Sequence, residues 1–272
     1  MCAGGVYAPT EREAHIIDGR TMKSEVYTPG YTPNATNFMA TRTLESHGRF
    51  FVPFLSANHD VLDLGCGPGT ISVDIARLVA PGKVAGIDSS ESQVVQARKL
   101  AEEAGVSNVD FHVGSCYELP FVNQSFDRIF CHALMEHLAD PVAALREAFH
   151  KLKKDGMIGV CSPDSDGWLL SPSSAELEAA VTAYADLQQA NGGNLRIGKN
   201  LGVLLQDAGF TDIHLTARYE CYPSLEFIGE YFAIQLAQNG FDRHATTLRE
   251  WAKDSTGMFA QAWVSAVAKK SQ

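Results

Sequence analysis

The chain has 272 residues and a formal net charge of −10, an acidic balance that disfavours a broad interface with nucleic acid or an anionic membrane. Hydrophobic residues make up 45% of it and charged residues 20%, as in an ordinary globular protein. Its length allows one large α/β domain with an insertion, or one domain and a small cap. The six cysteines form no C-x-x-C pair, which predicts neither disulfides nor a metal site. We find no export signal and no apolar run that could span a bilayer, so we expect a cytoplasmic protein.

The first 33 residues are rich in Gly, Pro, Thr and Tyr and show no sustained periodicity, which predicts an irregular N-terminal arm over 1–33. Tyr27 and Tyr31 stand in a part of this arm that prolines stiffen. Their rings could lie flat over a ligand, or they could anchor the arm to the core. A helix is predicted from Asn34 onward, ended by Pro53.

A glycine-rich loop follows the predicted strand Val61–Leu64, with glycine at positions 65, 67 and 69 before a helix. Such a loop brings bare backbone close to a ligand at a helix N-terminus. The dinucleotide fingerprint needs glycine at its sixth position, where this chain has Thr70. Asp63, two residues before the first glycine, would repel a pyrophosphate and suits a ligand that carries an ammonium group. The alternative is that Asp63 only caps the helix.

Strands and helices alternate after the glycine loop, with further strands predicted at 83–88, 109–113, 126–131 and 157–161. Ser90 and Gln93 form a capping-box pattern at the start of one intervening helix, and Asp140 suits the N-cap of another. This alternation predicts a parallel, doubly wound sheet with right-handed crossovers.

The regular alternation stops at 162–198. Residues 213–219 and 259–267 alternate in hydrophobicity, as expected of a closing pair of strands at the sheet edge. Between those two segments, 223–256 is predicted to be helical and aromatic. We therefore expect 162–198 and 223–256 to be cap insertions in a domain that spans 34–272.

Polar groups follow four consecutive predicted strands at the edge of the sheet where ligands bind in open α/β folds. The glycine loop follows the first strand. Asp88 follows the second, where its carboxylate could accept from two ribose hydroxyls or could help cap the next helix. Ser115 and Cys116 follow the third, and His132 and His137 follow the fourth. Four such strand ends together predict a nucleotide-type ligand more strongly than the loop alone.

This order of motifs resembles the class I S-adenosylmethionine-dependent methyltransferases, which carry D/E-x-G-x-G-x-G where this chain has Asp63 to Gly69. The leader Tyr27–Tyr31, the Arg42-Thr43 pair and the block from His132 to Pro141 resemble more closely the subgroup related to ubiquinone and menaquinone biosynthesis (methyltransferase type 11). The resemblance implies a Rossmann-like, doubly wound seven-stranded sheet, parallel with an antiparallel edge strand, plus a helical cap. It also implies S-adenosyl-L-methionine as cofactor and S-adenosyl-L-homocysteine as product.

The resemblance also implies roles for individual residues. Asp63, Gly65 and Gly67 would hold the methionine part of the cofactor and Asp88 the ribose. Ser89, Ser115 and Cys116 would flank the adenine, and His132 would lie beside the sulfonium. The implied cofactor-binding set is Tyr31, Arg42, Asp63, Gly65, Gly67, Asp88, Ser89, Gln93, Ser115, Cys116 and His132. We expect the acceptor pocket to include Tyr27, Met135, Trp168, Phe227 and Tyr231. Ser115 departs from the family, which usually has an aspartate there, so its bond to the adenine amino group would be weaker.

The predicted activity is methyl transfer to a small molecule, an in-line displacement that depends on orientation and exclusion of water. The aromatic cap favours an apolar or aromatic acceptor, and oxygen, nitrogen or carbon could be methylated. His137 is the candidate base if the acceptor must lose a proton, and otherwise a packed residue. The expected partner is a small molecule, with no nucleic acid, membrane or metal, and a homo-oligomer stays open. Two alternatives are an S-adenosylmethionine-binding protein that does not methylate and a nicotinamide dehydrogenase that tolerates Thr70.

Overall fold

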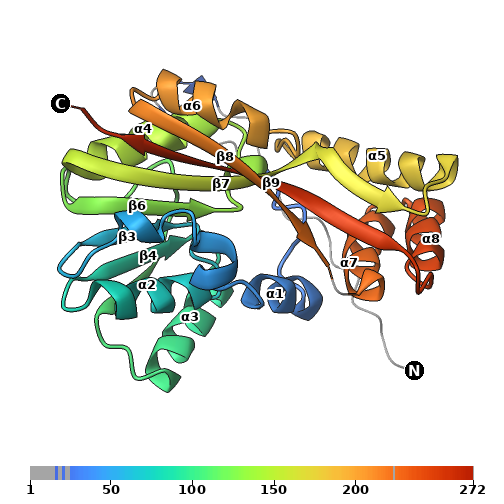
Figure 1. The fold of residues 1–272 in the computed structure, drawn as a ribbon, viewed down its shortest axis with the longest axis horizontal. Helices are drawn as coiled ribbons and strands as arrows, with labels where there is room; N and C mark the ends of the chain where they lie inside the picture. The colour runs from blue at the N-terminus through green and yellow to red at the C-terminus, as the bar shows by residue number, and fades with distance from the viewer. Residues whose placement is uncertain (1–15, 18–19, 22–24, 223, 272) are drawn as a thin grey trace.

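The computed structural model describes residues 16–17, 20–21, 25–222 and 224–271. Its main feature is a seven-stranded sheet with the strand order β5-β4-β3-β6-β7-β9-β8 (Figure 1). The strands are β3 (Val61–Leu64), β4 (Val84–Asp88), β5 (Val109–Val113), β6 (Phe126–His132), β7 (Leu152–Ser171), β8 (Thr211–Cys221) and β9 (Met258–Lys269). The strands from β5 to β7 are parallel, and β9 runs antiparallel to both β7 and the outermost strand β8. The predicted doubly wound α/β fold is confirmed.

Helices cover both faces of this sheet, as a parallel sheet requires. The helices α2 (Thr70–Val79) and α3 (Glu91–Glu103) pack on one face, and α4 (Pro141–Lys151) and α6 (Leu201–Asp207) on the other (Figure 1). Successive residues of β3 point to opposite faces, so Val61 joins the core under α2 while Leu62 and Leu64 join the core under α4. Asp63 therefore faces α2.

The single helix predicted from Asn34 is wrong. The structure has α1 (Pro33–Ala40), a π-helical turn η1 (Leu44–Gly48) and a short 3-10 turn η2 (Val52–Phe54). The chain breaks because two threonine side chains compete for backbone groups. Thr41 Oγ1 donates to the carbonyl of Phe38 over 2.8 Å, and Thr43 caps η1 by accepting from the backbone N–H of Ser46 at 3.1 Å. Arg42 lies in this break.

The predicted insertion at 162–198 begins with more strand, because β7 continues to Ser171. It pairs with β9 as far as Asp164 and again from Leu169 to Ser171, with an irregularity between the two stretches. The composition Ser-Pro-Asp-Ser-Asp-Gly at 162–167 is typical of a loop. The long partner strand β9 overrides that local preference by supplying hydrogen bonds. The extension carries Trp168 toward the cap.

The cap consists of α5 (Ala175–Ala190), α7 (Leu225–Gln238) and α8 (Asp242–Trp251), which gather around the far ends of β7 and β9 (Figure 1). These helices share a separate core of buried side chains that also takes in Ala35 and Phe38 of α1. Two short turns, η3 (Met135–His137) and η4 (Gly198–Asn200), complete the described elements of the main body. None of the helices in the described ranges has the length and hydropathy to cross a membrane.

The predicted arm over 1–33 falls partly outside the described residues. Within it, Ile16–Ile17 (β1) pairs antiparallel with Arg20–Thr21 (β2). The described part from Glu25 onward leads directly into α1 at Pro33.

Candidate active site

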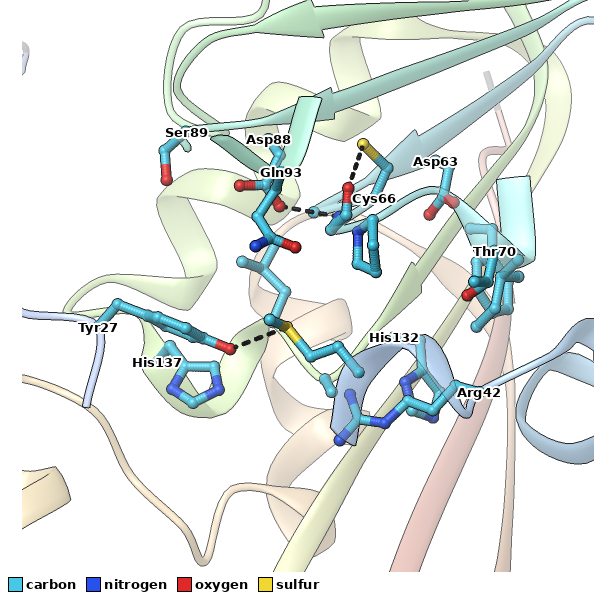
Figure 2. A pocket seen from close by; sticks show the side chains of 18 of the residues that line it. Tyr27, Arg42, Asp63, Cys66, Thr70, Asp88, Ser89, Gln93, His132 and His137 are labelled. Atoms are coloured by element: carbon cyan, nitrogen blue, oxygen red, sulfur yellow. Dashed lines mark hydrogen bonds between the residues drawn. The ribbon is translucent and has the colours of Figure 1, made fainter. Parts of the chain in front are cut away.

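A cavity lies at the carboxyl ends of β3, β4 and β6 and spans about 700 Å³ of space between atoms, part of it open to solvent (Figure 2). Nine of the eleven predicted cofactor residues line it, namely Tyr31, Arg42, Asp63, Gly65, Gly67, Asp88, Ser89, Gln93 and His132. Eight lining residues were not predicted, namely Met39, Cys66, Pro68, Thr70, Ile71, Phe130, Ala133 and Leu134. Cys66, Pro68, Thr70 and Ile71 belong to the glycine loop or to the start of α2, so the loop motif was the available signal for these four.

The glycine loop is held to the end of β4 by Asp88. Gly65, Gly67 and Gly69 all have positive φ angles, 76°, 52° and 81°, a conformation that favours glycine. The two carboxylate oxygens of Asp88 accept from the backbone N–H groups of Gly67 and Ser90, each at 2.9 Å. Burial raises the pKa of Asp88, and these two hydrogen bonds oppose that shift. Each oxygen keeps a lone pair that can accept from a ligand hydroxyl.

Asp63 is a buried carboxyl group in the wall of the same cavity, with 3% of its surface exposed. It does not cap α2, whose N-cap is Gly69. Its Oδ2 accepts from the hydroxyl of Ser72 at 2.5 Å. Burial raises the pKa of Asp63 to about 7, against the effect of the Ser72 hydrogen bond. Within the described ranges no lysine, arginine or histidine forms an ion pair with it, so a ligand ammonium group would be its first cationic partner.

Gln93 lines the cavity with an unsatisfied acceptor. The predicted capping box is only half formed: Ser90 Oγ accepts from the backbone N–H of Gln93 at 3.4 Å, but the Gln93 side chain donates to Thr36 Oγ1 at 3.1 Å. The other amide atom, Gln93 Oε1, is buried without a hydrogen-bond partner. Buried acceptors of this kind are uncommon in folded proteins, and a bound ligand is one explanation.

The predicted adenine contacts at Ser115 and Cys116 are not part of the cavity wall. Ser115 is exposed, and its hydroxyl accepts from the backbone N–H of Tyr117 at 3.1 Å. The hydroxyl of Tyr117 in turn donates to Glu25 at 2.9 Å. The segment after β5 thus forms hydrogen bonds within itself and with the arm. Ser115 and Cys116 do not join the predicted cofactor residues that line the cavity.

A second cavity adjoins the first, and Tyr27, Met39, Arg42 and His137 line both. It spans about 480 Å³ of space between atoms, part of it open to solvent. Its wall is mainly aromatic, with Phe38, Trp168, Tyr184, Tyr231, Phe232 and Trp263. The structure thus places three predicted acceptor-pocket residues, Tyr27, Trp168 and Tyr231, in one wall. The buried indole N–H of Trp168 has no hydrogen-bond partner.

Two residues predicted for the acceptor pocket lie elsewhere. Met135 is fully buried in the core beneath α4, because the η3 turn points it into the sheet. Phe227 packs against the ring of Phe38 at a centroid distance of 5.6 Å and does not line the cavity. Both predictions are corrected by the packing.

One ring nitrogen of His137 has a hydrogen-bond partner. Gln188 Nε2 lies 2.8 Å from both the carbonyl oxygen of Glu136 and His137 Nδ1, so the amide donates to both and Nδ1 accepts. The proton of the neutral ring then resides on Nε2, which lies 3.7 Å from Glu136 Oε1. Burial, with Arg42 adding to it, lowers the pKa of His137 to about 3. The ring is therefore a weak proton acceptor at neutral pH, which argues against the predicted base.

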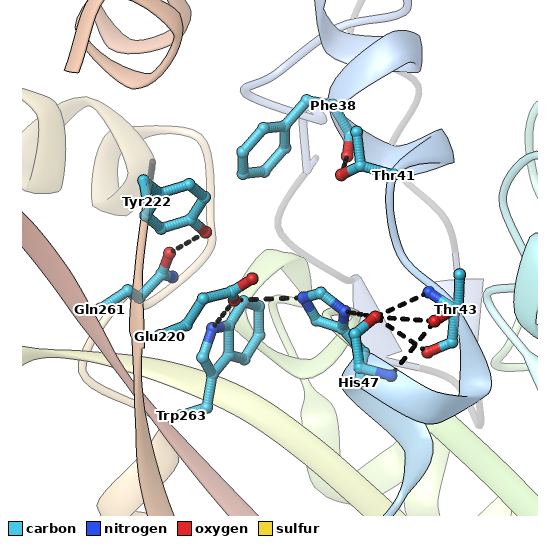
Figure 3. Close-up of polar contacts among 9 residues, drawn as sticks. Phe38, Thr41, Thr43, His47, Glu220, Tyr222, Gln261 and Trp263 are labelled. Atoms are coloured by element: carbon cyan, nitrogen blue, oxygen red, sulfur yellow. Dashed lines mark hydrogen bonds and ion pairs between the residues drawn. The ribbon is translucent and has the colours of Figure 1, made fainter. Parts of the chain in front are cut away.

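A polar network absent from our sequence-based predictions joins η1 to β8 and β9 next to the cavities (Figure 3). Glu220 Oε2 of β8 accepts from the indole N–H of Trp263 at 2.7 Å and lies 3.1 Å from His47 Nε2 of η1. The guanidinium of Arg42 lies 5.4 Å from the centroid of Trp263. His132 also packs on Trp263, at 4.7 Å, and burial, followed by the charge of Arg42, holds its pKa well below the usual range.

The described end of the arm forms part of both cavities. Tyr27 stacks on Tyr31 at a centroid distance of 5.1 Å. The Tyr27 ring also contacts the ring of His137 edge-on at 4.6 Å (Figure 2). Its hydroxyl donates to Met39 Sδ over 3.4 Å. The cap holds the following backbone, since Gln235 Nε2 donates to the carbonyl of Pro29 at 3.2 Å. The two predicted alternatives for these tyrosines, ligand cover and anchor, are therefore compatible.

Comparison with known proteins agrees with this geometry. The family model of the methyltransferase domain matches residues 55–209. An uncharacterized 37.1 kDa protein in a transposon of Streptomyces fradiae is 34% identical over 74% of this chain and 58% of its own length, so the chain spans just over half of that relative. An uncharacterized methyltransferase of Schizosaccharomyces pombe is 28% identical over 86% of this chain and 92% of its own.

Among solved structures, the YcgJ protein from Bacillus subtilis is similar to this chain, with a TM-score of 0.62 and 19% identity. The match covers 82% of this chain and 98% of that one, which shows a shared fold. The family model covers more than half of the chain, and the cavity sits at the strand ends where this fold binds its ligand. The chain belongs to the class I S-adenosylmethionine-dependent methyltransferases, and S-adenosylmethionine is its cofactor.

Proposed function

We propose that this protein transfers the methyl group of S-adenosylmethionine to a small apolar or aromatic molecule, at an oxygen, nitrogen or carbon atom. The observation that supports this best is the pair of adjoining cavities, one with the glycine loop and the other with aromatic walls, which share Tyr27, Met39, Arg42 and His137. A donor in the first cavity and an acceptor in the second would meet at these four side chains.

The residues of the first cavity suit the cofactor. Asp63 offers a carboxylate to the methionine ammonium group, and Arg42 offers a guanidinium to its carboxylate. Asp88 offers acceptors to the ribose hydroxyls, and the free Gln93 Oε1 is available to a ligand donor. The bound cofactor supplies a methyl carbon that its sulfonium already activates. The chain orients the two reactants and excludes water from between them.

The proposed partner is a small molecule and not a nucleic acid or a membrane, because the wall of the second cavity is aromatic and the chain is acidic. A cytoplasmic location is part of this proposal. A homo-oligomer is compatible with it.

Incubation with S-adenosylmethionine carrying a labelled methyl group and a small-molecule extract tests the proposal. We expect label in one or a few extract components, with S-adenosylhomocysteine formed in equal amount. A protein that binds the cofactor without methylating would be stabilised against heat by S-adenosylhomocysteine but would transfer no label. Stabilisation without transfer would therefore refute methylation while leaving cofactor binding intact.

The affinity for S-adenosylhomocysteine should depend on pH through Asp63. Its pKa is about 7, so below that pH the carboxyl group must lose a proton before it can pair with the ligand ammonium group. Affinity should fall by up to about tenfold per pH unit as the pH drops below about 7, and should level off above it. Calorimetric titrations across this range measure the slope.

Asp63→Asn should bind more weakly at neutral pH and show no slope in this range. Glu136→Gln is the matched control, because burial raises the pKa of Glu136 to about 7 as well, but this carboxyl lines only the second cavity. The control should keep the slope. A flat profile for the unmodified protein would exclude an ion pair between Asp63 and the ligand.

We also propose that the arm around Tyr27–Tyr31 closes over the bound cofactor, because these stacked rings line the cavity while Tyr31 keeps 43% of its surface exposed. Amide hydrogen exchange at Tyr27–Tyr31 should slow when S-adenosylhomocysteine is added. Deletion of 1–33 should lower turnover and preserve the fold. Exchange rates that do not change when the ligand is added would mean that these residues only anchor the arm.

A further inference from the structure

Glu136 is a buried carboxyl group in the wall of the aromatic cavity, and no part of the cofactor site described above uses it. It lies in η3, between β6 and α4, with 3% of its surface exposed. Its Oε2 accepts from the hydroxyl of Ser162 at 3.0 Å. Its Oε1 has the Nε2 of His137 at 3.7 Å as its nearest basic neighbour. Across the described ranges, no lysine or arginine forms an ion pair with it.

A carboxyl group buried in such a place destabilises the fold, which suggests that it is retained for another role. Removal of an ionised carboxylate from water is unfavourable, and an aromatic wall compensates for little of that cost. Burial raises the pKa of Glu136 to about 7, with the hydrogen bond from Ser162 and the charge of Arg42 opposing the shift. The group can thus hold or release a proton near neutral pH.

The other titratable groups around Glu136 do not compete for this role. Burial keeps His137 neutral, and its Nδ1 accepts from the amide of Gln188. Tyr184 of α5 and Tyr231 of α7 face it with pKa values raised by burial, to about 12 for Tyr231. Cys131 of β6 and Cys161 of β7 are likewise held neutral by burial. Arg42 is the one cation in the described wall of this cavity, and Glu136 the one carboxylate.

We propose that Glu136 takes the proton released by the acceptor, and that the acceptor is therefore a molecule with an O–H, N–H or acidic C–H bond at the reacting atom. This inference rests on the proposed methyl transfer. The acceptor atom forms a bond to the methyl carbon while the carbon–sulfur bond breaks. The electron pair of the broken bond stays on sulfur, which becomes a neutral thioether. The proton of the acceptor passes to the Glu136 carboxylate, which becomes a neutral acid.

The atoms and charges balance in this step, because a sulfonium and a carboxylate give a thioether and a carboxylic acid. The class of acceptor follows from it. Phenols, alcohols, primary and secondary amines and acidic carbon compounds have a proton to give to Glu136. Tertiary amines and thioethers have none, so methylation of such a molecule would not depend on Glu136.

Turnover of the acceptor found in the extract assay tests the role of Glu136. Glu136→Gln keeps the shape of the side chain but cannot take a proton, so kcat should fall by about a hundredfold to ten-thousandfold. The affinity for S-adenosylhomocysteine should stay within about twofold, which shows that the variant is folded. His137→Gln should lower kcat less than Glu136→Gln does.

Ser162→Ala distinguishes a Glu136 that takes the proton from one with a merely structural role. Loss of the donor to the carboxylate should raise the pKa of Glu136, so the acidic limb of the kcat/KM profile should move to higher pH while turnover at alkaline pH persists. An unmoved limb would mean that Glu136 is not the group that titrates.

The protonation of Glu136 can also be measured without any acceptor. Infrared difference spectra of the protein saturated with S-adenosylhomocysteine should show a buried carboxylic acid band that titrates near neutral pH and is missing in Glu136→Gln. Absence of that band, or turnover of Glu136→Gln within about threefold of the unmodified protein, would overturn the role of Glu136 alone. Failure of the unmodified protein to transfer label to any extract component would instead remove the proposed function, and this inference with it.

Discussion

Replacement of Asp88 by alanine is expected to weaken S-adenosylhomocysteine binding by about tenfold to a hundredfold. The loss of hydrogen bonds from a charged group amounts to about 1.5–3 kcal/mol, which corresponds to that change in affinity. Asp88 is proposed to hold the ribose, and its carboxylate also accepts from the backbone N–H groups of Gly67 and Ser90. The substitution therefore removes a ligand contact and frees the glycine loop from the end of β4.

Calorimetric titration measures this effect, and Asp110→Ala is the matched control. Asp110 is an exposed aspartate on the neighbouring strand β5, paired with Ala85, so its removal changes the net charge equally. The affinity of Asp110→Ala for S-adenosylhomocysteine should stay within about twofold of that of the unmodified protein. Asp88→Asn should give an intermediate result, because it keeps one acceptor oxygen. Unchanged affinity in Asp88→Ala would take this residue out of the site.

Gly69→Ala should destabilise the fold by about 2–5 kcal/mol. Gly69 has a φ of +81°, where an L-residue is strained by about 1–2 kcal/mol. Its added methyl group would also lie 2.7 Å from Ala97 Cβ and 2.9 Å from Phe111 Cζ. Overpacking of this kind adds about 1–3 kcal/mol, because α3 and β5 would have to move. Denaturant unfolding measures the sum.

Gly105→Ala separates the two contributions. Gly105 has a similar φ of +65°, but nothing lies within 4 Å of the place where its Cβ would be. This variant should lose only the backbone contribution of about 1–2 kcal/mol. Equal losses in the two variants would show that the loop has room for a side chain at Gly69.

Short-range patterns determined much of this molecule. The periodicity of apolar residues predicted the parallel strands, the helices that cover them and the closing pair β8 and β9. The cofactor cavity was also predictable, because a parallel sheet brings the ends of its strands to one edge wherever the strands occur. The glycine loop and Asp88 lie at two such ends, so their meeting follows from the topology alone.

Only the tertiary structure decided which side chains face the acceptor. Glu136 and His137 are consecutive in the chain, yet the amide of Gln188, about fifty residues later, engages His137 and leaves the carboxyl group of Glu136 in the cavity. Met135, in the same turn, points into the core instead. Local sequence carries no information on these orientations, since contacts from distant elements determine them.

The same reason explains the polar network of His47, Glu220 and Trp263 beside the site. His47 and Glu220 are 173 positions apart, and they meet because the helix predicted from Asn34 breaks at Arg42 and η1 packs against the last strands. Strand β7 runs on through a loop-like composition because β9 is there to pair with it. Local preference determined the scaffold and the cofactor end. Long-range packing, whose energy outweighs those preferences, determined the acceptor end.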